Sequence, residues 1–386
     1  MLPDDPRWRL RCDPLASATI HDLYAERSLA AANRVLAEVV LNDQPDPEGL
    51  PATVRHYLTL SARRPEWADP EQIRAAQELF TERGPLILMA LVTASLAECY
   101  ALGHGAQVLA LTRRMDERHI YRRVYETAQF IVDICSPGGL EPGGRGLRAI
   151  QKVRLMHGGV RHLILAPTPS GTAGDTRNFV DVLLRTQWDV ERLGLPINWQ
   201  DQCFTLQSFA GIIVRSLERF GCSCNDAEAT AWLHLWAVVG HHLGIPDELC
   251  PRTVTAADEL YRRIRTSQEQ ATPQGRELTR ALGVFIAEKL DSPVMGRALS
   301  RTLLRWLCDD DTCRIVGIRP LNEIERALIR GGRWLVRLVW RDPRDVLHER
   351  LGLWLVTRLT KLPRGWERGL FSIPTEVSAA WRSRSP

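Results

Sequence analysis

Residues 120–164 read IYRRVYETAQFIVDICSPGGLEPGGRGLRAIQKVRLMHGGVRHLI, two stretches of helical period joined by a glycine-rich loop. In each stretch, mostly apolar residues recur at spacings of three and four, so that they would line one face of a helix. On the first stretch this face holds Ile120, Val124, Thr127, Ile131 and Ile134, and on the second it holds Ile150, Val153, His157, Val160 and Ile164. Two helices joined by a short loop tend to pack antiparallel, so polar residues on their facing sides should converge.

His157 is the polar residue in the middle of the second apolar stripe. A buried imidazole requires a partner, and Arg154 and Arg161, three residues before and four after it, lie on the flank of the same face. From that position the two arginines could pair with anionic groups of a ligand that the imidazole binds. From the spacing alone, a hydrogen-bonded core histidine and a metal ligand both remain open, and the core histidine is the commoner case.

The first stretch has a polar set of its own. Thr127 falls on the apolar face, Arg123 lies four residues before it, and Glu126 lies three residues after Arg123. The simpler interpretation is an Arg–Glu pair on a solvated helix face, with the threonine filling core space. The alternative is a polar site that faces the His157 helix.

Nearly every ordered segment of the chain has helical period, so we expect an all-α fold. Asp69-Pro70 should open a helix that runs to Phe80, and Gly84-Pro85 should separate it from an apolar helix over 85–102. That apolar run is near the lower limit for a membrane span, but it contains polar residues and a glutamate. We therefore expect a buried helix and no transmembrane helix.

The remaining segments also suggest helices. We expect them over 116–134, 179–193, from Asn198 to Phe220, from Asp226 to Gly244, over 256–270, 273–290 and 293–307, and as two basic amphipathic helices within 320–362. The loop over 136–146 lacks the Gly-Lys-Ser/Thr ending of a phosphate-binding loop and should be a connector. The polar loop over 167–178 is long enough to be a lid or a substrate-entry edge.

Composition limits the classes of function. With 386 residues, 45% of them hydrophobic, the chain should fold around a sizeable core, and we expect a single domain over 1–386. A net charge of +4 is too small an excess of positive charge for nucleic acid to be the main partner. From Gly331 onward, however, there are eleven Lys or Arg against five Asp or Glu, so this tryptophan-bearing tail either contacts a membrane surface or packs back on the domain.

Cysteine usage indicates the compartment. The nine cysteines are an odd number with no repeated spacing, which favours free thiols in a reducing compartment. The first residues lack the basic and apolar regions of a secretory signal, so we expect a cytoplasmic protein.

Several segments, taken in order, resemble one family: the haem-dependent oxygenases that include the latex-clearing proteins, which are rubber oxygenases, and the fungal membrane-bound oxygenase of mycophenolic acid synthesis. The resemblance covers roughly 88–290. It rests on Arg123-x-x-x-Thr127, on VRLMHGGVR at 153–161, on PINWQDQ at 196–202 with FTLQSF at 204–209, and on WLHLWAVVG at 232–240 with LGIPDEL at 243–249.

The resemblance implies an all-α fold with a globin-like core and a non-covalent haem b. It implies that His157 is the proximal iron ligand and that Arg123 and Thr127 lie close to the haem. Arg154 and Arg161 could pair with its propionates, and Gly158 and Gly159 would let the ring plane approach the helix backbone.

Two positions depart from the family pattern. Where latex-clearing proteins carry a distal lysine between the arginine and the threonine, this chain has Glu126, and the place of their catalytic glutamate falls near Gln107. Cleavage of polyisoprene is therefore in doubt, and a Glu126–Arg123 pair beside haem could instead move protons to or from dioxygen or peroxide.

The sequence thus predicts a haem oxygenase acting on an apolar small molecule or polymer, with Arg123, Glu126 and Thr127 near the chemistry. Two alternatives stay open: a non-catalytic haem- or lipophile-binding protein, and a helical interaction protein without the cofactor.

Overall fold

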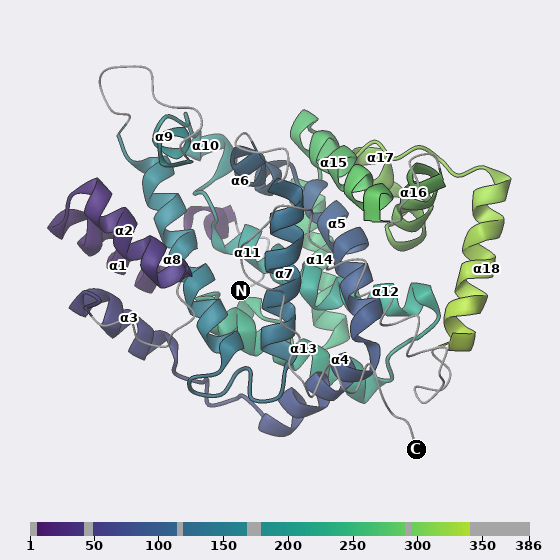
Figure 1. Ribbon diagram of the computed structural model, residues 1–386, viewed down its shortest axis with the longest axis horizontal. Helices are drawn as coiled ribbons and strands as arrows, with labels where there is room; N and C mark the ends of the chain where they lie inside the picture. The colour runs from purple at the N-terminus through teal and green to yellow at the C-terminus, as the bar shows by residue number, and fades with distance from the viewer. Residues whose placement is uncertain (1–5, 42–48, 114–118, 168–178, 290–294, 340–386) are drawn as a thin grey trace.

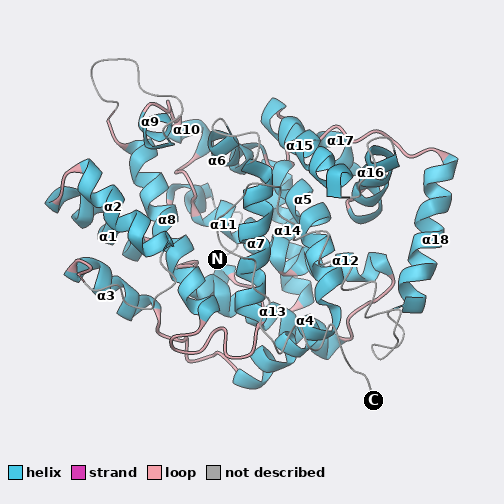
Figure 2. Cartoon of the chain, in the orientation of Figure 1, coloured by secondary structure: helices cyan, strands magenta, loops and turns pink. Residues whose placement is uncertain are grey.

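The structure, a computed structural model, describes residues 6–41, 49–113, 119–167, 179–289 and 295–339. Helices are the only extended regular elements in these ranges, as Figure 2 shows. Strand-like pairing among them is limited to one isolated bridge, between Leu102 and Glu269. The predicted all-α class is confirmed.

The first half of the chain supplies two long helices, α4 and α8, and several shorter ones around them (Figure 1). The elements are η1 (Pro6–Leu10), α1 (Pro14–Glu26), α2 (Leu29–Leu41), α3 (Ala52–Ser61), α4 (Pro70–Ala90), the π-helical turn η2 (Leu91–Ser95), α5 (Leu96–Tyr100), α6 (Gly103–Arg113), α7 (His119–Cys135) and α8 (Arg145–Leu165).

The second half continues as α-helices of four to seventeen residues, with one short 3-10 turn among them. The elements are α9 (Phe179–Leu184), α10 (Val190–Leu193), α11 (Trp199–Phe209), α12 (Gly211–Phe220), α13 (Asp226–His242), η3 (Asp247–Leu249), α14 (Val254–Gln268), α15 (Pro273–Lys289), α16 (Met295–Leu307), α17 (Asp310–Ile315) and α18 (Glu323–Val339).

The predicted break at Gly84-Pro85 is wrong. The start is as expected, since the Asp69 side chain accepts from the backbone of Glu71 at 2.8 Å and Pro70 is the first helical residue. The helix then continues through Pro85 and the π-helical turn to Tyr100. Pro85 removes one helical hydrogen bond, but Leu86, Ile87 and Leu88 behind it are fully buried, and this burial outweighs the loss.

The Pro70–Tyr100 rod is also the one described helix that is long and apolar enough to cross a bilayer, at 31 residues. In this fold 72% of its apolar window is buried inside the protein. A buried core helix meets the same criteria of length and composition, so this helix is weak support for a membrane span.

Two other expected helices are broken. The helix predicted from Asn198 to Phe220 divides at Ala210, whose φ of −95° and ψ of −92° are not helical, and the one expected over 179–193 divides into α9 and α10. The candidate lid at 168–178, the start of the helix expected at 116, and the second basic helix beyond Val339 lie outside the described residues.

The core is divided among three apolar clusters, and α8 contributes to all of them. Ile150 belongs to the main cluster, Leu155 to a cluster with α1, α2 and α3, and Leu163 and Ile164 to a cluster with α9. The helix that carries His157 is therefore held on several sides, which limits how far its side chains can shift.

Candidate functional site

The glycine-rich loop places α8 against α7. A Cβ on Gly146 would lie 2.6 Å from the Cα of Ile134, so the first turn of α8 lies against the last turn of α7. The backbone N–H of Leu147 also donates to the carbonyl of Gly139 at 2.8 Å. The chain therefore turns back on itself, and α7 and α8 pack together as the spacing predicts.

The α8 helix is fastened to two other elements through Arg154. Its Nε and Nη2 each donate to a carboxylate oxygen of Asp13 at 2.7 Å, and Nη1 donates to the carbonyl of His242 at 3.1 Å. Asp13 is 2% exposed and also caps α1 through the N–H groups of Leu15 and Ala16. All three nitrogens of the Arg154 guanidinium are thus used within the protein, and Arg154 holds α1, α8 and α13 together.

His157 lies one turn further along α8. Its ring is partly exposed, but Nδ1 is buried and has no hydrogen-bond partner among the described residues. Burial lowers the pKa of the imidazole to about 4, and the positive charge of Arg161 acts in the same direction, while a hydrogen bond with the Gln202 side chain and the negative charge of Asp13 oppose the shift. The ring is neutral at physiological pH, which is the form that binds a metal.

Arg161, a further turn along, has an unsatisfied guanidinium. The residue is 4% exposed, and Nε, Nη1 and Nη2 are all buried without a hydrogen-bond partner in the described chain. Burial lowers its pKa, while Cys12 and Asp13 act in the opposite direction. A buried cation without hydrogen-bonded partners is costly, and the described residues supply no acceptor within hydrogen-bonding distance of this guanidinium.

The two glycines after His157 do not have the role that the sequence suggested. A Cβ on Gly158 would meet Ile20 Cγ1 at 3.1 Å and the carbonyl oxygen of Ala16 at 3.2 Å, and one on Gly159 would meet Leu36 Cδ1 at 3.3 Å. Both glycines therefore admit helices α1 and α2 rather than a flat ligand.

The residues expected on α7 are only partly visible. Thr127 is half-buried and Glu126 is exposed, while Arg123 lies on the helix but its side chain is outside the described part. Gln107 is half-buried on α6 and donates to the carbonyl of Gly103 at 3.4 Å.

Sequence reasoning missed Asp13 and Gln202. Asp13-Pro14 is a helix-start signal, and that signal alone could have identified the cap on α1. Its pairing with Arg154, 141 positions away, has no local signature. Gln202 follows the Asn198 cap of α11, which accepts from the N–H of Asp201 at 2.9 Å, and this cap fixes where the first turn of α11 begins.

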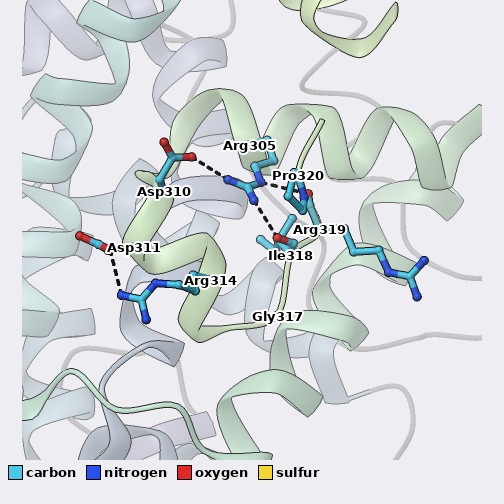
Figure 3. A pocket seen from close by; sticks show the side chains of 8 residues that line it. All are labelled: Arg305, Asp310, Asp311, Arg314, Gly317, Ile318, Arg319 and Pro320. Carbon is cyan, nitrogen blue, oxygen red and sulfur yellow. Dashed lines mark hydrogen bonds and ion pairs between the residues drawn. The ribbon is translucent and has the colours of Figure 1, made fainter. Parts of the chain in front are cut away.

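A surface pocket of about 510 Å³ lies elsewhere, around α17, and Figure 3 shows its lining residues. It is rich in arginine, but Arg305 already donates to Asp310 at 2.7 Å and to the carbonyls of Ile318 and Arg319 at 3.0 Å each. Arg314 is paired with Asp311 at 2.9 Å. Figure 1 places α17 far across the molecule from α8, and the Arg305 and Arg314 side chains of this pocket are already paired with protein groups.

The thiols and the other potential metal ligands of the described ranges do not gather into a metal site. All nine cysteines are free thiols. Within the described ranges, no three His, Cys, Asp or Glu side chains converge as a metal site. A metal held by protein side chains alone would need such a cluster, whereas haem iron needs one axial histidine.

Comparison with known proteins gives three findings. The family described as "ER-bound oxygenase mpaB/B'/Rubber oxygenase, catalytic domain" matches residues 82–339. The rubber oxygenase of Streptomyces sp. (strain K30) is 28% identical over 345 residues, covering 87% of this chain and 76% of the relative. A structure of latex clearing protein in the closed state matches with a TM-score of 0.71 and 23% identity over 95% of each chain, so the two share a fold.

Proposed function

Because the chain belongs to the mpaB/rubber oxygenase catalytic-domain family, we propose that it is a haem b-dependent oxygenase in which His157 is the axial iron ligand. Family membership gives the class, an oxygenase. The cofactor and its ligand rest on the chemistry of α8, and the globin-like core that the resemblance implies is part of the same proposal.

The observation that carries the proposal is that two side chains on α8 have nitrogen atoms without hydrogen-bond partners among the described residues, namely His157 Nδ1 and the Arg161 guanidinium. One helix face presents a neutral, partly exposed imidazole whose Nδ1 is buried without a hydrogen-bond partner among the described residues and, one turn later, a buried guanidinium whose nitrogens also have none there. Haem b would supply a partner for each, because its iron takes a neutral imidazole and its propionates take a guanidinium. The residues present therefore fit the group.

The arginines on either side of His157 would have different roles. Arg161 would bind a propionate and so orient the haem relative to α8. Arg154, whose nitrogens are held by Asp13 and the carbonyl of His242, is better suited to positioning the helix than to contacting the cofactor. Haem supplies the activation of dioxygen or peroxide when bound, while the protein sets axial ligation, access and proton delivery.

Proton delivery is assigned to α7. The exposed Glu126 carboxylate can exchange protons with solvent, and Arg123 and Thr127 on the same helix would stabilise negative charge that develops near it. If so, Glu126→Gln should lower turnover with dioxygen or peroxide by about 10²-fold or more while leaving the visible spectrum intact. Unchanged turnover would remove Glu126 from the chemistry.

The substrate class is proposed to be apolar, either an isoprenoid or another lipid-like small molecule or polymer. The support is the relative named as a rubber oxygenase. Gln107 cannot accept a proton as a carboxylate does, so polyisoprene itself should be tested beside shorter isoprenoids and other lipids. Product analysis with each also separates an oxygenase from a protein that only binds haem or lipophiles. The nine free thiols support a reducing, cytoplasmic setting.

The direct test is a visible spectrum of protein purified after expression with haem available. We expect a Soret band in the wild type, its loss or displacement in His157→Ala, and its retention in His162→Ala. His162 is a suitable control because it lies on the same helix but stacks on Tyr24 at 4.5 Å. Circular dichroism should show that both variants remain helical. Absence of a Soret band from the wild type would end the haem proposal.

A further inference from the structure

The α18 helix, at the edge of the molecule in Figure 1, exposes an apolar stripe. Ile324 is 73% exposed, Leu328 55%, Leu335 44% and Leu338 45%, and their spacings of four, seven and three residues place them along one side of the helix. Five of the eleven large hydrophobic side chains left exposed in the described ranges are on this single helix. The side that packs on the protein is the adjacent one, where Glu325 and Val336 are buried at roughly 100–120° around the helix from Ile324, with Val339 buried at the border between the two.

A row of arginines occupies the remaining exposed side of α18. Arg326, Arg330 and Arg333 follow one another at spacings of four and three, and all are exposed. Arg326 is paired with Glu323 at 2.8 Å, whereas Arg330 and Arg333 have no carboxylate partner in the described part of the chain. The other acid of the helix, Glu325, is buried and paired with Arg301.

Trp334 lies between these two rows and is 66% exposed. At 3.6 residues per turn it is about 40° around the helix from Arg330 on one side and from Leu338 on the other. The order around the exposed surface is thus apolar stripe, tryptophan, arginine row.

We propose that α18 is a membrane-docking helix that lies in the interface of an anionic phospholipid bilayer. A helix in that position buries an apolar side among the acyl chains, places tryptophan at the headgroup level and keeps arginine near the phosphates. Arg330 and Arg333, which have no carboxylate partner within the described ranges, provide the complementary charge. A protein partner would need an apolar groove for the stripe and carboxylates for the arginine row, placed side by side. An anionic bilayer presents acyl chains and negatively charged headgroups together at any point of its surface.

The inference is independent of the cofactor and is tested with the full-length protein and sedimented vesicles. We expect binding to vesicles that contain phosphatidylglycerol, and binding at least about 10-fold weaker to pure phosphatidylcholine vesicles or at high salt, because charge attraction is lost. Equal binding to both vesicle types would overturn the anionic part of the proposal.

Paired variants identify the helix. Leu328→Ser with Leu335→Ser, and separately Arg330→Gln with Arg333→Gln, should each weaken vesicle binding by about 10-fold or more. The matched controls are Val254→Ser with Val284→Ser, and Arg262→Gln with Arg280→Gln, which change exposed residues on α14 and α15 and should have no effect.

Two outcomes would overturn the proposal. One is vesicle binding that is unchanged in both α18 variants. The other is a wild type that ignores vesicles and instead forms a dimer that the Leu328→Ser, Leu335→Ser variant abolishes, because α18 would then be an interface between copies of this chain.

Discussion

Two arginines on one helix face have opposite surroundings. Arg154 and Arg161 are both buried, at 8% and 4% exposed, yet the first has hydrogen-bond partners for all three guanidinium nitrogens and the second for none among the described residues. Desolvation penalises a buried charge unless pairing offsets it. Arg154 therefore has a structural role, and Arg161 is the group that the proposed haem site would use.

Arg161→Met should act in opposite directions on the two forms of the protein. Without haem, removal of an unsatisfied buried charge should raise the free energy of unfolding by about 2 kcal/mol. With haem, loss of a charge-assisted bond worth about 1.5–3 kcal/mol should raise the haem dissociation constant about 10- to 100-fold. Urea unfolding and haem titration measure the two effects.

Arg154→Met is the matched control. It leaves the Asp13 carboxylate buried and unpaired, so it should lower the free energy of unfolding by about 3–5 kcal/mol in both forms. If Arg161→Met destabilised the haem-free protein to the same extent, Arg161 would have a partner within the protein and its assignment to a propionate would fail.

For single residues, the sequence identifies the candidate cofactor-binding side chains better than the residues that hold their helix in place. His157 stands out because it interrupts a regular apolar stripe and Arg161 because it flanks that stripe, and among the described residues neither His157 Nδ1 nor the Arg161 guanidinium has a hydrogen-bond partner. Asp13 could not be identified because its pairing depends on the packing of α1 against α8, and such long-range contacts leave no periodic trace.

At the scale of elements, close approach of helices explains residues that resembled cofactor contacts. Gly158 lies against the backbone of Ala16, and Gly159 lies against the end of the Leu36 side chain. Backbone cannot yield to an added methyl group, while a leucine terminus can rotate.

Gly158→Ala should therefore lower the free energy of unfolding by about 1–3 kcal/mol. Gly159→Ala, one residue away on the same helix, should be neutral or should stabilise by up to about 1 kcal/mol, because alanine favours helix more than glycine does. Urea unfolding of the two variants side by side checks this order, and the reverse order would show that α1 does not approach α8 as described.

Tertiary packing can override a local sequence signal for the end of a helix. Gly84-Pro85 is a typical helix boundary, yet the rod from Pro70 to Tyr100 passes through it because the residues beyond are needed in the core. Helix starts without such competition, at Pro70 after the Asp69 cap and at Asp226, are where the sequence places them.

For the whole molecule, buried neutral histidines couple folding to pH. Burial is the largest cause that lowers the pKa of His104, His157 and His242 to about 4. His242 is 1% exposed, and its Nδ1 lies 3.0 Å from the carbonyl of Ser61 at the end of α3. Because these rings protonate more readily in the unfolded chain, stability is highest above pH 6.5 and falls as the pH drops towards 4.

The contribution of His242 can be isolated with His242→Gln. Between pH 7 and pH 5 the depressed pKa of His242 should cost the wild type on the order of 2 kcal/mol that the variant does not lose. The exposed His56→Gln is the control and should keep the wild-type pH dependence. Denaturant unfolding at the two pH values provides the comparison, and parallel losses in wild type and His242→Gln would contradict a neutral His242.

The all-α architecture was predictable because nearly every segment repeats at helical period. How helices from distant parts of the chain surround α8 was not, since amphipathic stripes do not specify their partners. The family segments predict more of the fold than composition does, because their order along the chain is typical of one family. The structural comparison confirms that this chain shares the fold of a latex clearing protein.

The central claim is that α8 binds haem through His157, and imidazole rescue tests it most directly. His157→Gly, supplied with haem, should lack the wild-type visible spectrum and regain it when free imidazole fills the space left by the side chain, while His162→Gly should keep the wild-type spectrum throughout. A His157→Gly protein whose haem spectrum equals that of the wild type without imidazole would contradict the claim.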